Sequence, residues 1–162
     1  MMTAWGAFPG HIGVRQVMLE RASALSQSGR WGAAAGLLRA AIDEHADVSL
    51  AAMLGGVLVQ LDRHEDAIVL LRAARVADPD NVSLLLNLAT ALVHAAEDAD
   101  ALAVLGRARD VVGAERLPPL HATALALLEQ RNGADVLARS ALESMDPEEA
   151  WANSLRRLLE ML

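Results

Sequence analysis

The chain has 162 residues, of which 54% are hydrophobic, and its formal net charge is −7. This acidity argues against nucleic-acid binding and against electrostatic docking on anionic lipid, because both need clustered basic residues. The absence of cysteine excludes disulfides, thiolate metal sites and a thiol nucleophile.

The apolar residues are mostly Ala and Leu, with one Phe, three Trp and no Tyr, which predicts an all-α fold. The most apolar run, 82–96, contains polar residues and is shorter than the ~20 residues a membrane-spanning helix needs. Residues 1–10 lack the basic start of a signal peptide. We therefore expect no membrane insertion and a cytoplasmic location.

Residues 1–12 are expected to form an irregular arm. Helical periodicity then predicts helices over 13–27 and 31–45, separated by a Ser-Gly pair. Asp47 is expected to cap a third helix over 48–61, because its carboxylate can accept hydrogen bonds from the free amides of the first turn.

The same periodicity predicts helices over 64–77, 82–95 and 98–112. The run Asp78-Pro79-Asp80-Asn81 is expected to stop one helix and start the next, since proline disfavours a helical conformation at the residue before it.

The pair Pro118-Pro119 is expected to open a helix that reaches about residue 130. Asn132-Gly133 predicts a turn into a further helix over 134–144. The run from Asp146 has an acceptor, a proline and two acidic residues, which predicts the start of a final capping helix over 147–162.

One segment of the chain is written nearly twice. Leu-Leu-Arg-Ala-Ala at 37–41 recurs at 70–74, and Val-Ser-Leu at 48–50 recurs at 82–84. Self-similarity at about 33 to 34 residues in a helical pattern is typical of a repeat array.

The repeats resemble tetratricopeptide repeats, in which large and small apolar residues alternate at set positions of two helices. The residues that carry the resemblance are Leu54, Gly55, Leu58, Ala67, Leu71, Ala74 and Pro79; Leu88, Ala89, Leu92, Ala101, Leu105 and Ala108; Ala22, Leu25, Ala34, Leu38 and Ala41; and, more loosely, Ala122, Leu125, Ala134, Ala138 and Ala141. The resemblance implies a right-handed α-solenoid of about four hairpins (14–47, 48–81, 82–115 and 116–146) with a C-terminal capping helix.

The resemblance also implies that a partner protein or peptide binds in a concave groove lined by the first helix of each hairpin. Helical spacing then predicts the partner-binding residues, which are small, neutral and partly apolar: Gln16, Leu19, Ser23, Gln27, Ser49, Ala52, Gly56, Gln60, Ser83, Leu86, Asn87, Thr90 and His94. Binding on the convex face or the arm is the alternative.

Repeat domains that clamp acidic chaperone tails use Lys, Arg and Asn on this face. Here only Asn87 resembles such a residue, so docking of a carboxylate tail is disfavoured.

Catalytic patterns are missing from the sequence. The five histidines lie in separate segments without metal-ligand spacing, and no serine sits in a G-x-S-x-G turn. Neighbouring acidic residues such as Glu148-Glu149 point about 100° apart on a helix and cannot act as an acid–base pair. We expect no enzyme activity, no metal and no cofactor.

The sequence therefore predicts a protein–protein interaction scaffold. A small, acidic, helical repeat protein also resembles the bacterial type III secretion chaperones, which is one alternative. A second is a homo-oligomeric structural protein, with Trp5, Phe8 and the leucine-rich last helix as the homodimer face.

Overall fold

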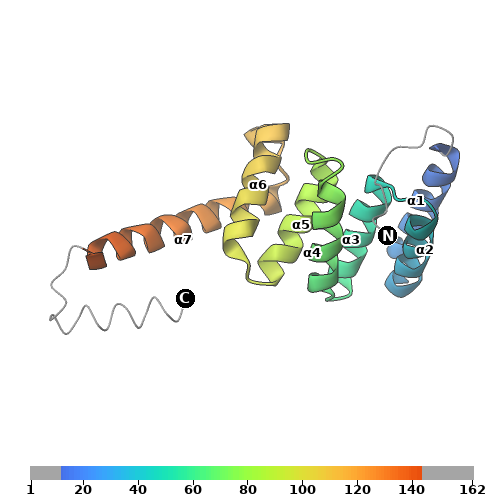
Figure 1. Ribbon diagram of the computed structural model, residues 1–162, viewed down its shortest axis with the longest axis horizontal. Helices are drawn as coiled ribbons and strands as arrows, with labels where there is room; N and C mark the ends of the chain where they lie inside the picture. Colours follow the sequence, from blue (N-terminus) through green and yellow to red (C-terminus); the bar gives the residue numbers. More distant parts are fainter. Residues whose placement is uncertain (1–11, 144–162) are drawn as a thin grey trace. The chain divides into compact units, whose positions relative to one another are not determined.

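The computed structural model describes residues 12–143, and the predicted arm and capping helix lie outside this range apart from the arm's last residue. The described residues form seven α-helices and one short 3₁₀ helix, without strands (Figure 1). The all-α prediction is therefore confirmed. The helices are α1 (Ile12–Gln27), α2 (Trp31–Glu44), α3 (Val48–Gln60), α4 (His64–Arg75), α5 (Val82–His94), α6 (Asp98–Val112), η2 (Ala114–Arg116) and α7 (Pro119–Glu143).

The chain divides into two compact units, Met1–Ala122 and Thr123–Leu162. In the first unit α1 packs on α2, α3 on α4, and α5 on α6, so successive helices form hairpins (Figure 1). The first helices also contact one another, α1 with α3 and α3 with α5. Each second helix contacts the first helix of the next hairpin, which makes the first unit an array of stacked hairpins.

A residue in the left-handed backbone region turns the chain inside each hairpin. These residues are Gly29, Asp62 and Ala96, with φ values of 73°, 56° and 58°. Each lies two residues before the second helix of its hairpin begins. Only glycine adopts this conformation without steric cost, so the packing of both helices holds Asp62 and Ala96 in place.

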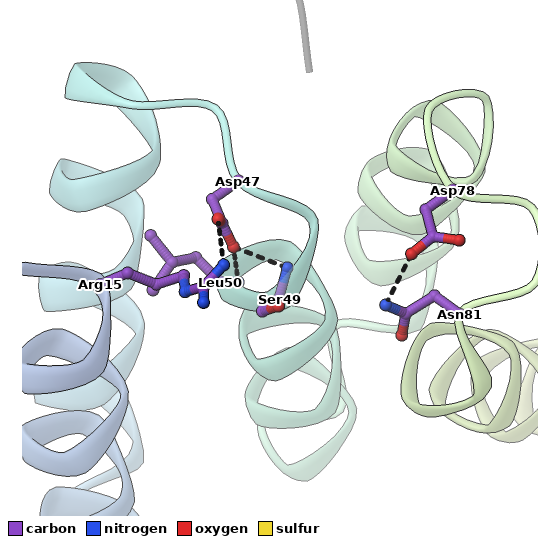
Figure 2. Close-up of polar contacts among 6 residues, drawn as sticks. All are labelled: Arg15, Asp47, Ser49, Leu50, Asp78 and Asn81. Atoms are coloured by element: carbon purple, nitrogen blue, oxygen red, sulfur yellow. Dashed lines mark hydrogen bonds and ion pairs between the residues drawn. The ribbon is translucent and has the colours of Figure 1, made fainter. Parts of the chain in front are cut away.

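Side-chain caps fix where two of the first helices start, and Figure 2 shows the cap of α3. The Asp47 carboxylate accepts hydrogen bonds from the amides of Ser49 (2.8 Å) and Leu50 (3.2 Å), which confirms the predicted cap of α3. Asn81 caps α5 in the same way through the amide of Leu84, at 3.1 Å. Each cap satisfies amides that have no partner within the helix.

The core of each hairpin consists of leucine packed against alanine or glycine. An added Cβ at Gly55 would lie 2.6 Å from the side chain of Leu71, so only glycine allows α3 and α4 to approach this closely. Ala67 and Ala101, at matching positions of the second helices, are fully buried. Small residues at helix crossings let the axes come together while leucines fill the adjacent space.

The structure differs from the sequence-based prediction at the C-terminal end of the described range. Residues Asn132 and Gly133, expected to turn the chain, are helical, and α7 continues unbroken from Pro119 to Glu143. The turn prediction is wrong for this structure. Asn and Gly together lower helix stability by only about 1 to 2 kcal/mol relative to alanine, and the Ala- and Leu-rich residues on both sides favour the helix.

Candidate functional site

The outward side of α1, α3 and α5 is the candidate binding surface, because these helices contact one another along the first unit. We call the thirteen predicted partner-binding residues on it the first-helix face. None of them is Lys, Arg, Asp or Glu. The surface therefore offers hydroxyl, amide, imidazole and apolar groups.

Most of these side chains are accessible. Gln16, Gln27, Gln60, Ser83 and His94 are exposed. Leu19, Ser23, Ser49, Gly56, Leu86, Asn87 and Thr90 are partly exposed. Ala52 is buried at 3% exposure, because the first helices pack side by side where it lies, so its side chain is not available to a partner.

Asn87 joins two first helices instead of pointing freely outward. Its Nδ2 atom donates a hydrogen bond of 2.8 Å to the carbonyl of Ala52. Its amide group also lies over Gly56, where an added Cβ would come within 3.2 Å of it. The glycine makes room for this contact between α5 and α3. Helical spacing alone does not reveal the contact, because it depends on how neighbouring repeats meet.

Thr90 is bridged to a residue that sequence reasoning left out. Its hydroxyl lies 2.9 Å from the carbonyl of Leu86 and 3.1 Å from Nε2 of His121, near the start of α7. His121 belongs to the same compact unit as Thr90. A short hydroxyl–imidazole contact of this kind orders both side chains at the edge of the first-helix face.

His94 also has a partner that was not predicted. Its ring stacks on that of His64 with centroids 4.6 Å apart and planes within 10° of parallel. His64 opens α4 and His94 closes α5, so the pair bridges two hairpins. The signal available in the sequence was that each histidine stands at a helix end beside a hairpin turn. An open depression surrounds the pair, lined by Asp62, Arg63, His64, Glu65, Asp66, His94 and Ala95.

Charged side chains also form ion pairs between neighbouring hairpins. Arg72 of α4 binds Glu97 at 2.8 Å and also Asp100, and Arg107 of α6 binds Asp80 at 2.8 Å. The hydrogen bond to Glu97 raises the pKa of Arg72. These half-exposed pairs link neighbouring hairpins. One carboxylate, Glu20, accepts a hydrogen bond from Gln16 on the first-helix face at 2.9 Å.

Between residues 12 and 143, no three His, Asp or Glu side chains are grouped so that they could hold a metal ion. No helix in this part is both long and apolar enough to cross a membrane.

Comparison with known proteins gives one family model that matches part of the chain. The family model described as tetratricopeptide repeat (TPR) matches residues 58–115. None of the curated proteins matches the sequence.

Two solved TPR domains have a similar structure. The TPR domain of Arabidopsis OM64 is 19% identical, with a TM-score of 0.66 over 74% of this chain and 98% of that domain. The second TPR domain of human RPAP3, solved with the HSP70 peptide SGPTIEEVD, is 14% identical, with a TM-score of 0.61 over 69% of this chain and 92% of that domain. At these identities the likeness concerns the fold.

Proposed function

We propose that this chain, whose residues 58–115 match the tetratricopeptide-repeat model, is a non-catalytic scaffold that binds a segment of a partner protein on its first-helix face. The observation that carries the proposal is that α1, α3 and α5 lie side by side and present twelve accessible, uncharged residues. A surface of this kind suits an extended or helical segment recognised by shape and a few hydrogen bonds. The RPAP3 domain, which shares the fold, was solved with a bound peptide, and this supports the proposal.

The chemistry of the first-helix face favours an uncharged segment over an acidic tail. The peptide bound to the RPAP3 domain ends in Glu-Glu-Val-Asp. Carboxylates are recognised best by Arg and Lys, which the first-helix face lacks. Its one asparagine, Asn87, already donates one of its two amide hydrogens to the carbonyl of Ala52. A nearby carboxylate, Glu20, would repel an acidic ligand.

A peptide titration tests this preference directly. We expect the labelled peptide SGPTIEEVD to give no saturable fluorescence-anisotropy change up to about 1 mM, which corresponds to binding weaker than about −4 kcal/mol. Saturable binding that is lost in the Arg72→Ala/Arg107→Ala double variant would contradict the proposed site, because both substitutions lie outside the first-helix face. Saturable binding lost with Leu86→Glu, which adds a carboxylate to the first-helix face, would contradict the proposed preference alone.

A paired-variant pull-down tests the location of the site. The tagged protein would be compared with a Gln60→Arg/Leu86→Arg variant, which adds two charges to the first-helix face. The matched control is Val69→Arg/Val76→Arg, which adds the same charges to α4 and its C-cap residue, at side chains that are 71% and 86% exposed. We expect a partner that the parent and the α4 variant retain and the first-helix variant loses, with all three proteins folded by circular dichroism. The reverse pattern would place the site on the second helices.

The cytoplasmic location and the two alternative roles stay predictions from the sequence. A secretion chaperone should co-purify with an exported client and keep that client soluble. A homo-oligomer should sediment at a multiple of the monomer mass at every practical concentration, whereas a general scaffold should do neither.

A further inference from the structure

Helix α7 is unbroken, yet its residue types recur at the same spacing as in the hairpins. In the second and third hairpins the left-handed turn residue, Asp62 or Ala96, stands fourteen residues after the first residue of α3 or α5. The same count from Pro119, the first residue of α7, reaches Gly133. Gly133 therefore occupies the position at which the preceding hairpins turn, and glycine is the residue best suited to that conformation.

The residues before Gly133 match the first helices of the second and third hairpins. In those hairpins a leucine and then a small residue stand eight and seven positions before the turn residue. The leucines, Leu54 and Leu88, are each 1% exposed. The same count from Gly133 reaches Leu125, which is 5% exposed, followed by Ala126. The buried leucine of α7 thus stands where the register requires one.

The residues after Gly133 match the second helices. In all three formed hairpins an alanine and a leucine stand five and nine positions after the turn residue, and each is fully buried. The same count reaches an alanine and a leucine in α7. The sequence-based match had placed Ala134 and Ala138 at these two positions, four residues earlier in the chain. The pairs are Ala34 and Leu38, Ala67 and Leu71, Ala101 and Leu105, and Ala138 and Leu142.

The straight helix gives no packing reason for a glycine at position 133. An added Cβ there would meet nothing within 4 Å, and glycine is less favourable than alanine in a helix interior. Gly32, Gly36 and Gly106 are equally open in their helices, so it is the register on both sides of Gly133 that carries the inference.

We propose that α7 has a second form, in which the chain turns at Gly133 and residues 135–143 pack against the first part of the helix as a fourth hairpin. One position of α7 departs from the pattern of the hairpins, and this explains why the straight helix competes with the proposed hairpin. The second and third hairpins have a buried leucine, Leu58 or Leu92, four residues before the turn residue, and α7 has Glu129 there. A carboxylate at this position weakens the fourth hairpin, because burial disfavours its charged form.

Introduced cysteines distinguish the two forms, since the natural chain has none. Gly55 and Leu71 meet in the second hairpin, and their equivalents in α7 are Ala126 and Leu142. In the straight helix these two positions are about 24 Å apart, far beyond the reach of a disulfide, whereas in the hairpin they are in contact. We expect the Ala126→Cys/Leu142→Cys protein to form an intramolecular disulfide under mild oxidation, detected by peptide mapping.

Three further variants calibrate the test. An Ala89→Cys/Leu105→Cys protein places the pair in the formed third hairpin and should cross-link. Adding Gly133→Ala to the α7 pair should slow its cross-linking about tenfold, because alanine favours the helix and disfavours the left-handed turn. Adding Gly106→Ala, which substitutes an equally open helical glycine, should leave the rate unchanged.

The proposal is overturned if the third-hairpin pair cross-links and the α7 pair does not. It is equally overturned if the α7 pair links only between two molecules, since the second half of α7 would then pair with another copy. A measurement without substitutions guards against misfolded variants. In the unmodified protein the NMR backbone couplings of Gly133 should report a population with positive φ, and purely helical values would contradict the hairpin.

Discussion

Gly55 illustrates how one absent methyl group sets the distance between two helices. Its position against Leu71, which is fully buried, leaves no space for a Cβ atom. We expect Gly55→Ala to lower the free energy of unfolding by about 1 to 3 kcal/mol through overpacking. Urea unfolding measures this loss. Gly106→Ala, where a Cβ meets nothing within 4 Å, should keep or slightly raise the stability, and equal losses for both variants would contradict the packing explanation.

Asp47 acts at the same scale, as a cap and as an ion-pair partner (Figure 2). It accepts two backbone hydrogen bonds and lies 3.4 Å from Arg15 of α1. Asp47→Ala should cost about 1 kcal/mol of stability, and Asp47→Asn should cost less because the amide oxygen still caps the helix. Thermal unfolding monitored by circular dichroism compares the two. Asp43→Ala, at an exposed position near the end of α2, should show no comparable loss.

At the scale of elements, Asn87 couples neighbouring repeats through the backbone of α3. Asn87→Asp removes the donor and places a carboxylate against the Ala52 carbonyl, which it can only repel. We expect a stability loss of about 1 to 3 kcal/mol. Denaturant unfolding beside Asn132→Asp, an exposed position in α7, separates this contact from a general effect of added charge. Losses of the same size would mean that the hydrogen bond contributes little.

For the whole molecule, the distribution of the core predicts how the array opens. Buried leucines and alanines concentrate in α3, α4, α5 and α6, while the buried residues of α1 and α2 are Ala22, Ala34 and Leu38. In a repeat array each hairpin is stabilised by its neighbours. Hydrogen–deuterium exchange should therefore be slowest in α3 and α5 and faster in α1 and in α7 after Gly133. Uniform exchange over all these helices would indicate a single cooperative unit instead.

The local elements were predictable because local chemistry determines them. Small and large apolar residues at helical spacing predicted α2 to α6 to within two residues, and the Asp47 cap follows from the acceptor before Val48. The turn at Asn132-Gly133 was predicted from the same kind of signal, yet the structure has a helix there. Turn residues lower helix stability only slightly, so contacts with the rest of the fold decide such a case. The site residues stay predictions, which the paired-variant pull-down tests.

The sequence by itself determined that this chain is an array of helical hairpins, because the repeat period and the alternation of large and small residues are properties of the chain. It also determined that the first-helix face is uncharged. Only the tertiary structure decided that Ala52 is buried and that Asn87 is bound to α3. It also decided that His94 stacks on His64 and that Thr90 meets His121. These contacts join residues about 30 or more positions apart, and they depend on how neighbouring hairpins pack, which no local pattern encodes.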